Sequence, residues 1–209
     1  MLFVLKQARW GIIPVQNLLL DLKHGYFCGG STPTRFKETG ALQIQHTNFV
    51  SLDEIFLRND LGVTPDDVLV DVGCGKGRVI AYWRQQKLGR KYIGIELDPE
   101  PAMISKERFK DAPEVQIING DAIENLPAEG TMFYLYNPFV ESVVRRFCEK
   151  LEAIADRRKP VRVVYNNCRH AELFTENPAW DTRPISNKNA YPAILATLKR
   201  TSENGSPQR

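Results

Sequence analysis

Short, continuous apolar runs separated by longer amphipathic segments dominate the middle of the chain. The runs lie at residues 68–72, 91–96, 115–119, 131–136 and 161–166. Because they are continuous rather than alternating, they are typical of strands buried on both faces of a parallel sheet. The segments between them that have helical spacing are 76–87, 99–110 and 140–156. The pattern therefore predicts a doubly wound α/β fold, with one short turn of helix near residue 122 in place of a longer crossover.

The C-terminal part of the chain has a different pattern. A helix is predicted over 169–175, followed by strand candidates at 180–184 and 191–199 that a polar turn separates. Two strands joined in this way predict an antiparallel hairpin that closes the sheet. Residues 201–209 are polar and are expected to form a tail.

The residues before the first strand are predicted to form an N-terminal extension of helices and loop. Residues 1–23 are rich in apolar side chains and predict one kinked or two short helices, and residues 24–40 carry closely spaced chain breakers typical of a loop. Ser51-Leu52-Asp53-Glu54 has the spacing of a capping box, which predicts a helix from there to Arg58. We therefore divide the chain into an extension (1–50), one domain (51–200) and the tail. The extension could be a lid over a site or a fixed layer.

Composition is consistent with one globular domain. The chain has 209 residues, of which 43% are hydrophobic and 25% charged. No apolar run approaches the roughly 18–20 residues that span a membrane, and the opening residues lack the pattern of a signal peptide, so we expect a cytoplasmic protein. The four cysteines form no C-x-x-C pair, so neither a metal site nor a disulfide framework is expected.

The net charge of the chain indicates which class of substrate it binds. A net charge of +3 and a pI of about 8.6 are milder than the footprint of a typical nucleic-acid-binding domain. The densest basic window, 145–162, is interleaved with acids, which is more typical of a solvated helix face. The composition thus favours a small molecule or a protein over nucleic acid as substrate, and leaves the oligomeric state open.

The most informative stretch for chemistry is Asp71-Val72-Gly73-Cys74-Gly75-Lys76-Gly77-Arg78, directly after the first apolar run. Glycines at every second position allow a sharp turn with positive φ and let a ligand lie against main-chain N–H groups. The dinucleotide fingerprint would need Gly or Ala where this chain has Arg78. Asp71 would repel a phosphate but suits a ligand that carries positive charge, so a partly cationic ligand is expected.

The next three strands also end in polar residues. Glu96 ends the second strand, 25 residues after Asp71, close to the spacing at which such folds place an acid on ribose hydroxyls. Asp121 ends the third strand and Asn137-Pro138-Phe139 the fourth. Each also has a purely structural interpretation, since acids open helices, aspartate caps them and Asn-Pro forms turns.

In order and spacing, these motifs resemble those of the class I S-adenosylmethionine (SAM)-dependent methyltransferases. The resemblance implies a single Rossmann-like, mostly parallel seven-stranded sheet with SAM as cofactor. It places Asp71 and the turn (Gly73, Cys74, Gly75, Gly77) at the methionine end, Glu96 at the ribose, and Leu97, Asp121 and Ala122 at the adenine. Asn137, Pro138 and Phe139 would face the methyl group.

The acceptor motif is less specific. Asn137-Pro138-Phe139 resembles the Asn-Pro-Pro-aromatic motif of methyltransferases that act on planar amines, but one proline is missing. The side chains of Tyr134 and Tyr136 share one face of the strand and are expected to pack in the core, while Asn166 or Asn167 could line the acceptor pocket. The function expected is methyl transfer from SAM, with a nitrogen atom held at Asn137-Pro138-Phe139 as the candidate acceptor. The alternatives are a SAM-binding module without transferase activity and, disfavoured by Arg78, a nicotinamide-dependent oxidoreductase.

Overall fold

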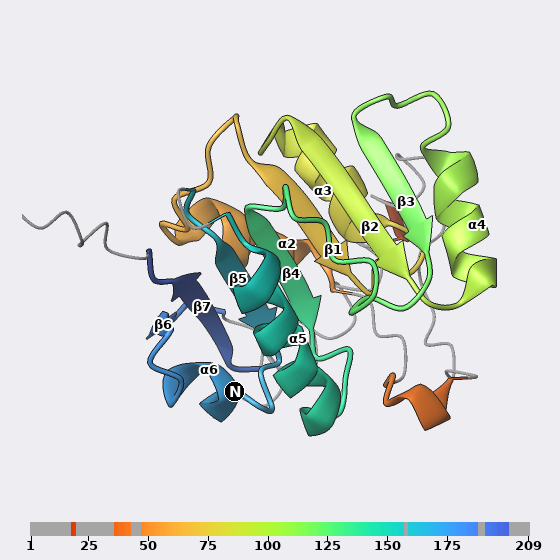
Figure 1. Ribbon diagram of the computed structural model, residues 1–209. Coiled ribbons are helices and arrows are strands. Elements are labelled where there is room, and N and C mark those ends of the chain that lie inside the picture. The colour runs from red at the N-terminus through yellow and green to blue at the C-terminus, as the bar shows by residue number, and fades with distance from the viewer. Residues whose placement is uncertain (1–17, 20–35, 43–46, 157–158, 188–190, 201–209) are drawn as a thin grey trace, which may run out of the picture.

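The computed structural model describes residues 18–19, 36–42, 47–156, 159–187 and 191–200. Its centre is a seven-stranded sheet with the order β3-β2-β1-β4-β5-β7-β6 (Figure 1). The five parallel strands are β1 (Val68–Val72), β2 (Lys91–Glu96), β3 (Val115–Asn119), β4 (Met132–Tyr136) and β5 (Arg162–Asn166). Two antiparallel strands complete the sheet, β6 (Trp180–Pro184) and β7 (Ala193–Leu198). The predicted fold class and the closing hairpin are confirmed.

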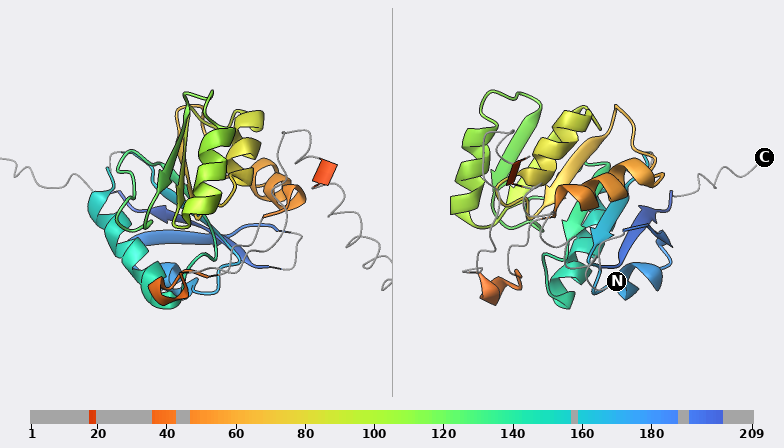
Figure 2. Two further views of the ribbon diagram at one scale, coloured as in Figure 1. Left: turned by 90° about the vertical axis from the view of Figure 1, so that its right-hand side faces the viewer. Right: turned by 180° about the vertical axis from the view of Figure 1, so that it is seen from behind.

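Helices cover both faces of the sheet (Figure 2). One face carries α2 (Phe49–Arg58), α3 (Arg78–Gln86) and α4 (Pro99–Arg108). The other carries α5 (Glu141–Ile154) and the short α6 (Glu172–Thr175). Between β3 and β4 no helix is assigned, but residues 122–125 form one turn in which Asn125 N–H donates to the carbonyl of Asp121 at 3.2 Å, as the short helical turn predicted near residue 122 would. Among the described residues, no helix is long and apolar enough to cross a membrane.

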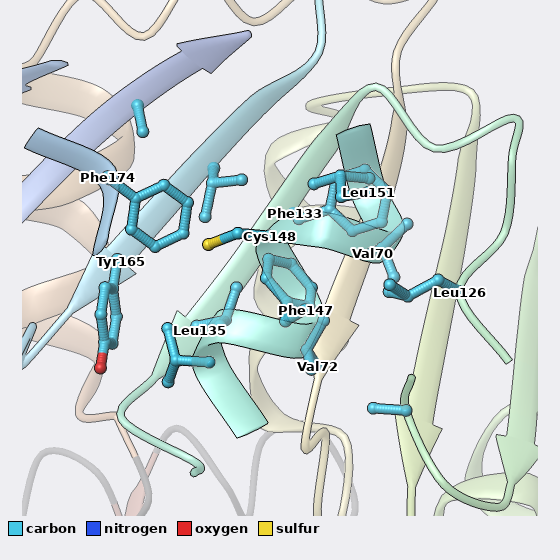
Figure 3. Close-up of a cluster of buried hydrophobic side chains, with 14 of the residues drawn as sticks. Val70, Val72, Leu126, Phe133, Leu135, Phe147, Cys148, Leu151, Tyr165 and Phe174 are labelled. Carbon is cyan, nitrogen blue, oxygen red and sulfur yellow. The ribbon is translucent and has the colours of Figure 1, made fainter. Parts of the chain in front are cut away.

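Each face of the sheet has its own hydrophobic core. On the α5 side, Phe147 and Leu151 pack onto Val70 and Phe133 of the strands (Figure 3). The rings of Phe133 and Phe147 meet edge to face, with centroids 6.1 Å apart. Both clusters consist of residues that the continuous apolar runs and helix faces predicted. This packing fixes the strand ends, where the polar motifs lie, relative to one another.

The start of α2 differs from the prediction. The helix begins at Phe49, and Asn48 caps it by accepting a hydrogen bond from the Ser51 main-chain N–H at 2.8 Å. Ser51 and Glu54, predicted as a capping box, are instead buried inside the helix. Asparagine is as good a cap as serine, and the earlier start buries the Phe49 ring in the core.

A segment from the N-terminal extension lies beyond the carboxyl ends of the strands. Residues 36–42, here called the strap, contain the 3-10 helix η1 (Lys37–Thr39) (Figure 1). Leu42 N–H donates to the carbonyl of Pro138 at 2.8 Å, and Val140 N–H donates to the carbonyl of Gly40 at 3.0 Å. The helices predicted within 1–23 lie almost wholly outside the described residues, and the lid stays a prediction.

Candidate functional site

The glycine turn after β1 forms the floor of a pocket. Gly73, Gly75 and Gly77 all have positive φ, at 81°, 52° and 78°, as the sequence predicted. At Gly77 a side chain is also excluded by contact, because a Cβ atom would lie 2.6 Å from the Phe109 ring. The main-chain N–H groups of Gly73 and Cys74 both donate to the carbonyl of Ile95, at 2.9 and 3.0 Å. The turn is thereby fixed against the end of β2.

Glu96, the last residue of β2, holds the turn from the other side. One carboxylate oxygen accepts a hydrogen bond from Gly75 N–H at 2.8 Å, and the other accepts one from Asp98 N–H at 2.9 Å. The side chain is buried and lines the pocket beside Leu97. Burial raises the pKa of this carboxyl, against the lowering effect of its backbone donors. Each oxygen keeps a second lone pair, so the carboxylate can still accept from a hydroxyl of a ligand.

Asp71 lies next to Glu96 in the pocket and is 3% exposed. Its Oδ2 atom is buried and has no hydrogen-bond partner within the described part of the chain. Burial, and secondarily the negative charge of Glu96, raise the pKa of this carboxyl well above its ordinary value. A buried, incompletely paired carboxylate is costly unless a ligand provides the missing partner. Asp71 therefore fits the ammonium group of a ligand.

Asp121 and Ala122 also line the pocket. The Asp121 Oδ1 atom accepts hydrogen bonds from the N–H groups of Ile123 and Glu124, at 2.8 and 3.2 Å. This is the capping role that the sequence left open. Asp121 also lines the pocket, where it could reach a ligand. Its contact with an adenine ring stays a prediction.

The side chains of the Asn137-Pro138-Phe139 motif differ in their surroundings, since Pro138 and Phe139 line the pocket and Asn137 is not among the described residues that line it. Asn137 adopts a left-handed conformation with φ of 41°, and its Oδ1 atom accepts a hydrogen bond from the Tyr165 hydroxyl at 3.2 Å. Pro138 and Phe139, in contrast, line the pocket, and Phe139 pairs with Ala41 of the strap. In this structure the Asn137 side chain is directed toward a core tyrosine while the turn it forms presents Pro138 and Phe139 to the site.

Several pocket residues were not recognised from the sequence, among them Arg78, Thr47 and Tyr134. Arg78 served only as an argument against a dinucleotide, Thr47 was not considered, and Tyr134 was assigned to the core. Tyr134 is buried but also lines the pocket, where its hydroxyl is 2.8 Å from the Thr47 hydroxyl and accepts from Asn166 Nδ2 at 3.0 Å. One signal was available for Tyr134, since β4 is the parallel neighbour of β1 and places it beside Asp71.

The comparisons with known proteins fit this geometry. Residues 69–170 match a family model described as a methyltransferase domain. The five parallel strands (apart from the first residue of β1), the glycine turn and the acids Asp71 and Glu96 lie in that region. In this region the chain resembles the class I SAM-dependent methyltransferases in motif order and in fold. SAM is the cofactor of this family, and the unpartnered Asp71 oxygen and the glycine turn fit it.

Several proteins that the chain resembles are named for RNA. A protein of Methanosarcina barkeri named probable ribosomal RNA small subunit methyltransferase A is 37% identical over 73 residues, which are 35% of this chain and 24% of that protein. An RNA methyltransferase from Salinibacter ruber, solved with S-adenosyl-L-homocysteine, shares the fold with a TM-score of 0.56 at 21% identity, covering 79% of this chain and 100% of that one. A candidate RNA methyltransferase from Pyrococcus horikoshii has a TM-score of 0.57 at 16% identity, covering 91% and 98%.

These relatives correct one prediction. The mild charge favoured a small molecule or a protein over nucleic acid as acceptor, whereas several curated relatives are named for ribosomal RNA. The preference was wrong because net charge reports nonspecific attraction to phosphate, and a site can select a base by shape and stacking without a strong basic field. The chain spans about a quarter of the length of those relatives, so their activity and substrate enter here only as a proposal.

The raised carboxyl pKa values give a pH dependence. Asp71 and Glu96 should take up protons at a higher pH than ordinary carboxyls, whose pKa values are about 3.9–4.3. Protonation removes the attraction for a cationic ligand, so SAM affinity should fall as pH is lowered from about 8 to about 5. Titration calorimetry across this range tests the prediction, with 5′-methylthioadenosine, which lacks the charged tail, as the ligand whose affinity should fall less. SAM affinity that stays constant down to about pH 5 would contradict it.

Proposed function

We propose that this protein transfers the methyl group of SAM to RNA. The observation that carries the proposal is a single pocket that joins two environments. The carboxylates of Asp71 and Glu96 in its lining suit the sulfonium cofactor, and the same lining includes the aromatic side chains of Phe36, Tyr136 and Phe139. An aromatic wall beside a methyl donor suits a nucleobase, because every base can stack on such a ring. The cytoplasmic location expected from the sequence fits this function.

When bound, SAM supplies an electrophilic methyl group, and the acceptor atom attacks it while the carbon–sulfur bond breaks toward sulfur. The residues of the chain hold the two reactants and exclude water. Asp71 and the glycine turn hold the charged tail, and Glu96 holds the ribose. Phe139 holds the acceptor base by stacking. Asn137 gives the turn its left-handed conformation, which brings Pro138 and Phe139 into the wall.

A nitrogen acceptor is the finer part of the proposal. It rests on the resemblance of Asn137-Pro138-Phe139 to the motif of enzymes that methylate planar amines. An exocyclic amino group of a base is planar and would lie flat against the Phe139 ring. The bond between Asn137 and Tyr165 argues that Asn137 acts through the shape of the turn rather than through its carboxamide.

Incubation with isotope-labelled SAM tests the function directly. Ribosomal RNA, transfer RNA and a protein mixture are offered separately, and labelled RNA is digested to nucleosides to identify the methylated atom. Label in RNA on a base nitrogen is the expected result. SAM binding without transfer to any acceptor would favour the binding-module alternative, and binding of NADH in place of SAM would overturn the cofactor assignment.

Phe139 provides a matched pair of variants. Phe139→Leu keeps an apolar side chain but removes the ring, and it should lower turnover by about 10- to 100-fold, from ~1–3 kcal/mol of lost stacking. Phe139→Tyr keeps the ring and should retain most of the turnover. Affinity for S-adenosylhomocysteine should change little in both. Equal loss of turnover in the two variants would show that the ring does not hold the acceptor.

A further inference from the structure

An exposed aromatic side chain lies just outside the pocket. Tyr191 precedes β7 by two residues and is 43% exposed, although its ring is large and mostly apolar. Its ring meets that of Tyr136 edge to face, with the ring centres 6.3 Å apart and the ring planes at 80°. Tyr136 is the last residue of β4 and lines the pocket. The aromatic lining proposed to hold the acceptor base therefore continues from the pocket to the surface.

The main chain after Tyr191 is fixed to the same edge of the sheet. Ala193, the first residue of β7, is the register partner of Asn166 at the carboxyl end of β5. The carbonyl of Pro192 accepts a hydrogen bond from Cys168 N–H at 3.2 Å. A proline also restricts the residue before it to extended conformations. These contacts hold Tyr191 at the carboxyl ends of the strands, where the pocket lies.

The ring of Tyr191 keeps a face for a ligand. In an edge-to-face pair, one ring contributes its edge and the other contributes one face. Whichever ring contributes the face, Tyr136 covers at most one face of Tyr191. The exposed fraction of 43% agrees with an open second face. Since every nucleobase can stack on an aromatic face, Tyr191 can bind a base whatever its sequence.

A positive charge lies in the adjoining segment. Arg169 follows Cys168, whose N–H donates to the segment of Tyr191, so the two residues belong to segments that a hydrogen bond joins. Arg169 is exposed, and among the described residues its guanidinium forms no ion pair. A guanidinium binds phosphate with charge-assisted hydrogen bonds. An aromatic ring and a guanidinium in adjoining segments suit the base and the phosphate of a nucleotide.

We propose that Tyr191 stacks on the RNA base next to the one that enters the pocket, and that Arg169 binds a phosphate of the same RNA segment. The inference rests on the proposed function and adds a second nucleotide subsite outside the pocket. A base inside a duplex is stacked on both sides and offers no face to Tyr191, whereas an unpaired base does. The substrate class is therefore RNA that is unpaired at the methylated position, such as a loop, a bulge or an end.

RNA binding by the unmodified protein and two variants tests the stacking. Fluorescence anisotropy, with S-adenosylhomocysteine present, measures the affinity for a mixed-sequence single-stranded RNA of about ten nucleotides and for its duplex. Tyr191→Leu should weaken binding of the single strand by about 10-fold, and Tyr191→Phe, which keeps the ring, should bind as the unmodified protein does. A single strand that the unmodified protein binds no better than the duplex would overturn the proposal, as would equal affinities of the two variants for the single strand.

The salt dependence of binding tests the phosphate contact. Affinity falls with rising salt in proportion to the number of phosphates that the protein neutralises, so the salt slope should become shallower by about 1 in Arg169→Met. Arg169→Lys keeps the charge and should keep the slope. Arg145→Met is the matched control, because Arg145 is exposed on α5 and pairs with Glu141 at 2.9 Å. An unchanged slope in Arg169→Met, or an equal change in Arg145→Met, would show that Arg169 does not bind the phosphate.

Failure of this inference is distinct from failure of the proposed function. Methyl transfer from labelled SAM to ribosomal RNA is measured in the same proteins, after thermal unfolding has verified that each is folded. If the unmodified protein labels no RNA, the proposed function fails and this inference falls with it. If RNA is labelled and Tyr191→Leu leaves kcat/KM unchanged, the proposed function stands and only this subsite is excluded. If Tyr191→Leu lowers transfer to a protein acceptor instead, the surface binds a polypeptide and the inference is wrong.

Discussion

Asp71→Asn is expected to weaken SAM binding by about 100-fold while it stabilises the free protein. The buried Oδ2 atom of Asp71 has no partner among the described residues, and burial together with Glu96 raises the pKa of this carboxyl. Loss of a charge-assisted bond to an ammonium group costs ~1.5–3 kcal/mol. In the free protein the asparagine removes a buried charge, so its thermal midpoint should rise by a few degrees, roughly the effect of 1–2 kcal/mol.

The pH dependence of the stability gain follows from the sign of the pKa shift. Since the folded-state pKa of Asp71 is raised, its ionisation opposes folding at pH values above that pKa. The gain from Asp71→Asn should therefore be largest at neutral pH and shrink as pH falls through the raised pKa, where the native carboxyl is already protonated. Calorimetry with S-adenosylhomocysteine measures the affinity, and thermal unfolding at several pH values measures the stability.

Asp66→Asn provides the control for both measurements. Asp66 is exposed in the turn before β1, so the same chemical change should alter neither affinity nor midpoint. Unchanged affinity in Asp71→Asn would show that Asp71 does not bind the tail of the cofactor. A lowered midpoint would show that the carboxylate stabilises the free fold, contrary to its burial and missing partner.

The sheet could be predicted from the sequence because burial on both faces leaves a simple signal. All five residues of β1 are buried, and its predicted bounds match the observed ones. The beginning of α2 could not be fixed in the same way. Asn48 and Ser51 are both good cap residues, and the choice between them depends on whether Phe49 enters the core, which is a tertiary contact.

Only the site residues at the carboxyl ends of strands could be predicted from the sequence. Asp71 and Glu96 follow from the motif because parallel strands bring their carboxyl ends to one edge. Thr47 meets Tyr134 across 87 residues of sequence, and no local pattern reports such a contact. Within the basic window 145–162, Arg145 and Arg146 of α5 are exposed as expected, whereas Arg162 is buried in β5, and the interpretation of the window did not identify the acceptor. Charge on one helix and recognition of a base are separate properties.

The opposite edge of the sheet is built for stability. At the amino ends of the strands, Arg162 of β5 forms an ion pair with Asp67 at 2.5 Å, and the two side chains are 7% and 5% exposed. The guanidinium also donates to the carbonyls of Leu61 and Gly62. Asp67 in turn accepts from the Thr131 hydroxyl at 2.6 Å. This network joins β5 to the segments that precede β1 and β4.

Arg162→Met should therefore destabilise the protein strongly without affecting the site. Removing one partner leaves Asp67 as a buried charge without its ion pair, which costs about 3–5 kcal/mol and corresponds to a fall of roughly 6–20 °C in thermal midpoint. Lys91→Met is the matched control, because the pair of Lys91 with Glu129 at the same edge is 35% and 49% exposed and should contribute less than about 1 kcal/mol. Denaturant unfolding gives both values, and calorimetry at low temperature should find S-adenosylhomocysteine affinity unchanged in both variants. If Arg162→Met lowered the free energy of unfolding by less than about 1 kcal/mol, the buried pair would be no stronger than the exposed one. If the folded variant lost affinity for S-adenosylhomocysteine, the two edges of the sheet would be coupled.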